Sequence, residues 1–237
     1  MKLWNASKLV LGHLAGFDPA AFPTAPRAPE RAVDRGVKLR LAATVADVTE
    51  MLDAYEFGLA KKRVEEFFWN DLCDNWLEMS KDRLYDTTPE RADVRASAQA
   101  TAHEVLATVL RLFAPFVPHV VEAVYQAGLR DADGHPSVTR TDWPALARPE
   151  ATDPSLVAWD VAVRALSGVR RWRSENKVSP GKPLGRVRLT LPAADASTFA
   201  SVEADVRSAG RVLALEIVPA TEGATDIGVT ILEGPAA

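Results

Sequence analysis

The stretch from Phe67 to Glu78 reads Phe-Phe-Trp-Asn-Asp-Leu-Cys-Asp-Asn-Trp-Leu-Glu and lies inside a long run with helical periodicity. From Glu56 to Ser80 apolar residues recur at steps of three and four. These residues are Ala60, Val64, Phe68, Leu72, Trp76 and Met79. Residues at such steps share one face of an α-helix. The sequence therefore predicts one long helix with a single broad apolar stripe.

Two further runs of the same kind flank this stretch, one from Asp34 to Tyr55 and one from Pro89 to Phe113. Their apolar residues are Val37, Leu41, Val45, Val48, Leu52 and Tyr55 in the first, and Val94, Ala98, Val105, Val109 and Leu112 in the second. Long helices with one apolar stripe each bury it by packing side by side. The chain is therefore predicted to be mainly α, with an antiparallel helical bundle.

Proline residues interrupt the third run. Pro115 and Pro118 predict a kink, and a short helix is expected near residues 120–125. A loop rich in Gly, Pro and Asp follows from 128 to 154, and another helix is expected from 155 to about 175.

The first residues form a further predicted helix, 2–15, followed by a proline-rich loop to Pro29. One face carries Leu3, Ala6, Val10 and Leu14, and the opposite face carries Asn5, Lys8 and Gly12. The helix opens on apolar residues without the Ser, Thr, Asp or Asn that ordinarily caps a helix. We therefore expect the chain to be a piece of a longer protein.

After Pro183 the period changes from helical to alternating. Val187, Leu189 and Leu191 alternate with polar residues, which is typical of a strand. A helix is expected over 196–211, and further strands over 212–218 and 228–232. The sequence thus predicts a helical-bundle domain at 1–183 and a small C-terminal α/β subdomain at 184–237.

The composition is that of a globular protein. The chain has 237 residues, of which 47% are hydrophobic and 25% charged, and its mean hydropathy is −0.07. It contains neither a long uncharged apolar run nor a leader pattern, and its single cysteine, Cys73, cannot form an internal disulfide. We expect a cytoplasmic protein that has no membrane partner.

Residue types that carry catalysis are scattered along the chain. The histidines, which lie at no metal-ligand spacing with cysteines or carboxylates, are His13, His103, His119 and His135. The sequence contains no Gly-rich phosphate loop and no nucleophile elbow. Asp71 and Asp74 lie one helical turn apart, but their aromatic neighbours favour a polar helix face over a cation site. We therefore predict no metal site and no catalytic residue, and favour a binding function.

Charge is unevenly distributed within a net charge of −4. Between Arg164 and Arg188 the only acidic residue is Glu175. The basic residues of this strip are Arg164, Arg170, Arg171, Arg173, Lys177, Lys182, Arg186 and Arg188. Such a strip either docks a polyanion or is a solvated helix face.

Five segments, in the same order, resemble the anticodon-binding region of valyl-tRNA synthetases. They are Lys2–Lys8, Phe67–Arg83, Leu110–Glu122, the Ser-Val and Trp-Pro pairs within Ser137–Pro144, and Arg170–Pro183. Each motif alone is weak, but together they cover residues 2 to about 183. One departure is Glu122-Ala123-Val124-Tyr125, where the family has Glu-Glu-Leu/Val-Trp.

The resemblance implies a bundle of the class Ia anticodon-binding type that recognises valine tRNA. In the full-length enzyme valine is attached to its tRNA with ATP and Mg, in an upstream catalytic domain of the same polypeptide. The ATP-site signatures His-x-Gly-His and Lys-Met-Ser-Lys-Ser are absent from this sequence. The chain alone is therefore expected to bind no cofactor and to be inactive, and no DNA partner is expected.

The first helix is the expected anticodon reader. Asn5 and Lys8 project away from the predicted core, and Lys2 precedes them. An amide reads base edges and an ammonium holds a phosphate or a base carbonyl. Alternatively, Lys8 is a solvated lysine. The aromatic residues Phe67, Trp69, Trp76 and Phe113 are expected in the core rather than as base-stacking platforms.

A second group is expected either to hold tRNA backbone phosphates or to pack against the upstream domain; it consists of Arg170, Arg171, Arg173 and Lys177. Two other functions remain open for the whole chain. It could be a free-standing tRNA-binding protein, or a helical protein-interaction module that binds no tRNA.

Overall fold

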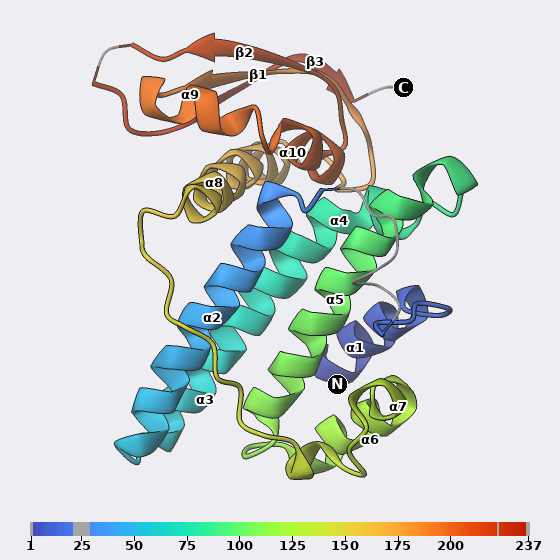
Figure 1. Ribbon diagram of the computed structural model, residues 1–237. Coiled ribbons are helices and arrows are strands. Elements are labelled where there is room, and N and C mark those ends of the chain that lie inside the picture. The colour runs from blue at the N-terminus through green and yellow to red at the C-terminus, as the bar shows by residue number, and fades with distance from the viewer. Residues whose placement is uncertain (1, 21–28, 222, 236–237) are drawn as a thin grey trace. The chain divides into compact units, whose positions relative to one another are not determined.

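The computed structural model describes residues 2–20, 29–221 and 223–235, which are mostly helical and include one small sheet (Figure 1). The longer helices are α1 (Lys2–His13), α2 (Ala32–Asp53), α3 (Phe57–Glu66), the π-helix η1 (Phe67–Trp76), α4 (Leu77–Leu84), α5 (Ala92–Phe113), α6 (Pro118–Gly128) and α8 (Pro154–Glu175). The shorter helices are η2 (Pro89–Arg91), α7 (Arg130–Asp133), η3 (Val138–Arg140), α9 (Ala193–Phe199) and α10 (Glu203–Gly210). The strands are β1 (Leu184–Leu191), β2 (Val212–Pro219) and β3 (Gly228–Pro235). A mainly helical chain with a small α/β part is thereby confirmed.

The chain folds as two compact units. Unit 1 comprises Met1–Glu30, Val37–Asp74 and Asp82–Pro149, and unit 2 comprises Arg31–Gly36, Asn75–Lys81 and Glu150–Ala237. The loop predicted up to Pro29 falls partly on residues 21–28, which lie outside the described residues.

The core of unit 1 is formed by the apolar stripes that the sequence predicts. The buried members include Val37, Leu41, Val45 and Val48 of α2, Ala60 and Val64 of α3, Phe68 and Leu72 of η1, and Ala98, Val105, Val109 and Leu112 of α5. Ion pairs link neighbouring helices. Arg63 in α3 lies 2.9 Å from Asp47 in α2, and Arg40 in α2 lies 3.4 Å from Asp71 in η1.

Tyr55 was wrongly predicted to continue the stripe of α2. The helix ends at Asp53, and Tyr55 takes a left-handed backbone with φ 59° in the turn before α3. Its side chain is 80% exposed. The turn between two helices therefore sets the conformation of Tyr55, and the apolar spacing does not.

The stretch Phe67–Trp76 is helical as predicted, but it is wound as a π-helix. Its buried residues come as adjacent pairs that repeat every four positions: Phe67 and Phe68, Asp71 and Leu72, and Asn75 and Trp76. An α-helix of 3.6 residues per turn would rotate such a column by about 40° at each step. A π-helix is wound more widely and rotates the column the opposite way. The same spacing of buried pairs continues at Met79 and Ser80 in the α-helix α4, so the spacing does not explain the π-helical winding.

Unit 2 contains a three-stranded sheet in the order β2-β1-β3. The central strand β1 pairs parallel with β2 and antiparallel with β3. Parallel neighbours need a crossover connection, and α9 and α10 supply it. Val187, Leu189 and Leu191 of β1 are buried at every second position, as the alternation predicts.

A single helix over 196–211 was wrongly predicted, since the segment divides into α9 and α10. The Ser201 hydroxyl and its backbone N–H both donate to the carbonyl of Thr198, at 2.7 and 3.1 Å. This turn ends the first helix and lets Phe199 and Val202 both be buried.

The first turn of α2 and the helix α8 are tightly packed within unit 2. A Cβ on Gly36 would lie 2.8 Å from the Cβ of Trp159 and 3.0 Å from the carbonyl oxygen of Ser155. Nearby in the chain, buried Asp34 accepts a 2.8 Å hydrogen bond from the indole N–H of Trp76. Close backbone contact and a buried polar pair therefore fix this part of the core.

The glycine contact gives a matched pair of stability predictions. Gly36→Ala should lower the free energy of unfolding by about 1–3 kcal/mol, because the added methyl meets Trp159. Gly58→Ala in α3 meets nothing within 4 Å and should raise it by about 0.5–1 kcal/mol. Urea denaturation measures both, and equal shifts of the two variants would contradict the packing described.

Candidate nucleic-acid interface

Helix α1 has a buried side and an exposed side. Ser7, Val10 and Leu14 are buried, while Asn5 and Lys8 are exposed, as their spacing predicts. The helix packs within unit 1 against α5 and α6. The Gln99 side-chain amide in α5 donates to the carbonyl of His13 at the end of α1. These contacts fix the helix while leaving its polar face accessible.

Two large apolar residues share the exposed side of α1 with the polar pair. Trp4 is 41% exposed and Leu9 is 39% exposed. An exposed indole beside an amide and an ammonium provides a stacking surface, a base-edge reader and a phosphate ligand on one helix face. Sequence reasoning did not single out Trp4 as a binding residue. Its position, one residue before Asn5 and one turn before Lys8, could have indicated that it shares their exposed face.

Lys2 is exposed, and its ammonium nitrogen lies 4.7 Å from the ring centre of Trp69 in η1. Such a cation–π contact contributes about 0.5–1 kcal/mol at an exposed site. Trp69 itself is half-buried, unlike Phe67, Trp76 and Phe113, which are in the core as predicted. Lys2 and Trp69 therefore hold the start of α1 against η1.

The basic residues expected to bind phosphate at the end of α8 differ in how far they are exposed to solvent. Arg171 and Lys177 are exposed, whereas half-buried Arg170 donates a 2.9 Å hydrogen bond to the side-chain carbonyl of Asn75. Arg173 is 5% exposed, and its guanidinium donates to the carbonyls of Ser179 at 3.0 Å and Gly210 at 2.9 Å. These bonds give Arg173 a structural role in place of the predicted phosphate contact.

The two proline-containing motifs of unit 1 are joined by Glu122 in α6. One of its carboxylate oxygens accepts from the Ser137 hydroxyl at 2.8 Å and from the backbone N–H of Val138 at 3.0 Å. Further on, the indole N–H of Trp143 donates to the Thr49 hydroxyl at 2.8 Å. The motif residues therefore close a loop onto the helices, a structural role.

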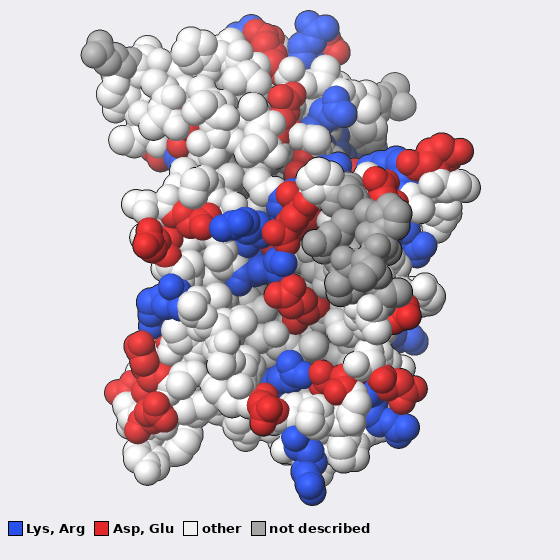
Figure 2. Space-filling view, in the orientation of Figure 1, with Lys and Arg blue, Asp and Glu red and all other residues white. Residues whose placement is uncertain are grey.

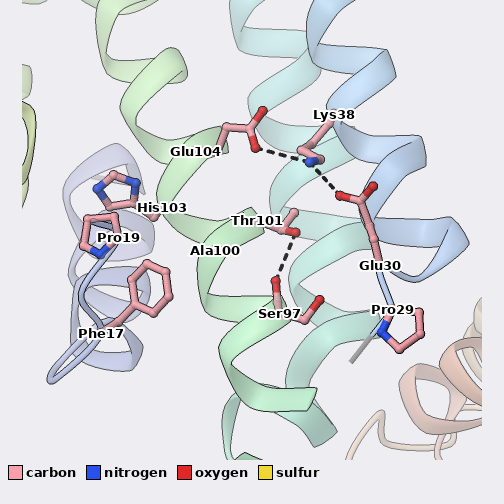
Figure 3. A pocket seen from close by; sticks show the side chains of 10 residues that line it. All are labelled: Phe17, Pro19, Pro29, Glu30, Lys38, Ser97, Ala100, Thr101, His103 and Glu104. Atoms are coloured by element: carbon pink, nitrogen blue, oxygen red, sulfur yellow. Dashed lines mark hydrogen bonds and ion pairs between the residues drawn. The ribbon is translucent and has the colours of Figure 1, made fainter. Parts of the chain in front are cut away.

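Unit 1 also contains a cavity of about 550 Å³ between α5, the start of α2 and the segment after α1 (Figure 3). The Lys38 ammonium lies 2.6 Å from Glu30 and 3.2 Å from Glu104. Burial alone lowers the pKa of Lys38, but hydrogen bonds to both carboxylates raise it above its ordinary value. Lys38 is therefore a charged ion-pair partner and is unsuited to act as a base. Burial lowers the pKa of His103 on the same cavity.

Acidic and basic side chains lie interspersed on the face of the molecule shown in Figure 2. Ion pairs join charged side chains within the described residues, such as Arg148 with Asp47 and Glu50 at 2.6 and 2.9 Å. A mixed surface produces no strong long-range field. On this face, binding to a polyanion would therefore depend on local groups.

The described residues form neither a cluster of metal ligands nor a membrane-spanning helix. Within residues 2–20, 29–221 and 223–235 no group of three His, Cys, Asp or Glu side chains is placed to hold a metal ion. In the same part of the chain, no helix combines the length and apolar character needed to cross a bilayer.

Comparison with known proteins identifies the class. Residues 34–189 match the family described as the anticodon-binding domain of tRNA ligase. This match covers well over half of the chain, and the chain belongs to that family. The matched residues begin in the first turn of α2, so α1 lies outside the matched range.

The relatives narrow the class further. The chain is similar to the valine–tRNA ligase of Methanothermobacter thermautotrophicus, with 38% identity over 77% of this chain and 19% of the relative. It is 36% identical to the valine–tRNA ligase of Haloarcula marismortui over 79% of this chain and 19% of the relative. With the valine–tRNA ligase of Thermobifida fusca the identity is 38% over 91% of this chain and 23% of the relative. The chain thus spans about a fifth of the length of these relatives.

The reactivity of Cys73 tests the packing of η1, the helix in which it lies. Burial, followed by the nearby charge of Asp74, raises the pKa of its thiol from 9.0 to about 12. Only the thiolate is nucleophilic, so alkylation by iodoacetamide at neutral pH should be about a thousandfold slower than for a free cysteine. Alkylation at the free-cysteine rate in the native chain would contradict the packing of Cys73, and the unfolded chain serves as the control.

Proposed function

We propose that this chain is the tRNA-binding module of a valine–tRNA ligase and that it reads the anticodon arm with the exposed face of α1. Family membership supports the tRNA partner, and the names of the relatives support valine specificity. The observation that carries the choice of α1 is the exposure of Trp4, Asn5 and Lys8 on a helix whose other face is buried.

The proposed architecture is an antiparallel bundle of the class Ia anticodon-binding type. The support comes from α2, α3 with η1, and α5, which share one core and are linked by the ion pairs of Arg63 and Arg40. A boundary between this bundle at 1–183 and an α/β subdomain at 184–237 remains a prediction from the sequence; β1 begins at Leu184.

The proposed full-length activity is the attachment of valine to its tRNA with ATP and Mg, in a catalytic domain of the same polypeptide. The matched part of each relative, about a fifth of its length, corresponds to the anticodon-binding region. Within that protein this chain would select the tRNA and orient it toward the catalytic domain. No part of the proposal involves DNA or a membrane.

Selection would come from base contacts on α1. The Asn5 amide both donates and accepts, so it matches one base edge better than another. The Lys8 ammonium provides charge-assisted hydrogen bonds to phosphate or base carbonyls. The Trp4 indole offers a surface on which an unstacked loop base can lie. Together these side chains supply specificity and affinity from a single helix face.

A protein-interaction function is the alternative that one observation favours. Tyr55, Phe57 and Leu59, at the turn from α2 into α3, are each more than half exposed. Exposed apolar groups in contact suit a protein partner, and the rings of Tyr55 and Phe57 lie 6.1 Å apart. Absence of tRNA binding at low salt would favour this alternative.

Variants on α1 test the proposed reading. Lys8→Ala should weaken binding to valine tRNA by about 1–3 kcal/mol, and Asn5→Ala should reduce the preference for the native over an altered anticodon. Fluorescence anisotropy with both tRNA transcripts measures affinity and preference. Lys62→Ala, which removes an exposed lysine paired with Glu66 in α3, is the matched control and should have little effect. Equal affinity of the wild-type chain for both anticodons would refute anticodon reading.

A further inference from the structure

Unit 2 contains a cavity of about 740 Å³, larger than the cavity beside Lys38 in unit 1. Its walls are the start of α4, the last turns of α8, the segment that follows α8, and the end of α10. The charged residues that line it are Lys81, Arg170, Arg173, Lys177, Arg211 and Glu78. Five cations and one carboxylate thus line one cavity in a chain whose net charge is −4.

The positive charges in this cavity are only partly neutralised. Glu78 forms an ion pair with Lys81. Burial, and then the nearby charge of Arg211, lower the pKa of Arg173. The guanidinium groups of Arg173 and Arg211 therefore repel each other. An anion bound near them would reduce that repulsion.

The backbone at two of these cations is unusual. Lys177 follows α8 with φ 54°, and Arg211 follows α10 with φ 48°. Glycine takes such left-handed positions at helix ends without steric cost, whereas a side chain with a Cβ is strained there. A basic side chain near a helix C-terminus also interacts favourably with the helix dipole. That effect accounts for each charge separately, but it does not account for two chain segments bringing their cations to one cavity.

The walls of the cavity are held by bonds that leave exposed cations at its mouth. Arg173 donates to the carbonyls of Ser179 and Gly210 and so connects the segment after α8 to the end of α10. Arg211 donates a 2.9 Å hydrogen bond to the carbonyl of Gly181 across the same segment. Lys177 and Arg211 are both exposed. Fixed walls with exposed cations are suited to holding phosphate oxygens.

We propose that this cavity binds the sugar–phosphate backbone of the tRNA, independently of its base sequence. The inference rests on the proposed function, because it assumes that the chain binds tRNA. It assigns Lys177, Arg211 and Lys81 to phosphate contacts, with Arg173 as the residue that positions the walls. Anticodon reading on α1 and phosphate contacts in unit 2 are then separable contributions.

The double variant Lys177→Gly/Arg211→Gly tests this inference. It removes two charges and also relieves both left-handed side chains, so a loss of binding cannot be attributed to backbone strain. Each phosphate contact contributes about 0.7 to 0.9 to the slope of log affinity against log salt concentration. The slope should therefore fall by about 1.5, and the loss of affinity between about 50 and 200 mM salt should shrink about tenfold. Thermal melting of the variant verifies that it folds.

The matched control is Lys61→Gln/Lys62→Gln, which removes two lysines that pair with Glu65 and Glu66 on α3. Its slope should remain close to that of the wild-type chain. Lys81→Gln keeps both left-handed residues and should lower the slope by about 0.7 to 0.9, which gives a second test. Neither cavity variant should change the preference between native and altered anticodons.

The outcomes separate the two proposals. An unchanged salt slope in the cavity variants overturns the phosphate site, even where Lys8→Ala still weakens binding and the anticodon reading stands. A reduced slope with no anticodon preference in the wild-type chain supports the phosphate site and refutes the reading by α1. Absence of tRNA binding by the wild-type chain at low salt overturns both.

Discussion

Burial of adjacent residue pairs along residues 67–84 is the constraint on which the helical part of the chain depends. The buried pairs are Phe67 and Phe68, Asp71 and Leu72, Asn75 and Trp76 (followed by buried Leu77), Met79 and Ser80, and Arg83 and Leu84. From the second pair onward each contains one apolar and one polar residue. The apolar member fills the core, while the polar member must find a partner because an unpaired buried polar group is costly. Asp71 finds Arg40, and Asn75 finds Arg170. Those partners fix the register of the helix, since a rotation would expose apolar groups and break the polar bonds together.

The same constraint explains what could be predicted from the sequence. The apolar steps of three and four in α2, η1 and α5 are a local pattern. The helices and their core residues could therefore be predicted from it. The outward face of α1 followed for the same reason, from the placement of Asn5 and Lys8 opposite Val10 and Leu14. The alternation in β1 equally predicted which residues are buried.

What could not be predicted depends on contacts between distant residues or on single turns. The burial of Arg173 requires the carbonyl of Gly210, which is 37 residues away in sequence. The division of 196–211 into two helices occurs at a single turn, where the hydroxyl and the backbone N–H of Ser201 both donate to the carbonyl of Thr198. The π-helical winding of Phe67–Trp76 has no separate signal in the sequence, because the same repeat of buried pairs continues into the α-helix α4. For the candidate site, the exposure of Trp4 was the missed feature, because a tryptophan in a helix is more often in the core.

The mixed sheet of unit 2 has a consequence for how this unit comes apart. The central strand β1 holds one hydrogen-bond ladder to β2 and another to β3, whereas within the described residues each outer strand is bonded to β1 alone. Either outer strand, β2 or β3, can therefore detach while β1 stays hydrogen-bonded to the other. Detaching β1 breaks both hydrogen-bond ladders at once and exposes Leu184, Val187 and Leu189. Local unfolding therefore begins at the outer strands, whereas loss of the whole sheet is a single cooperative step.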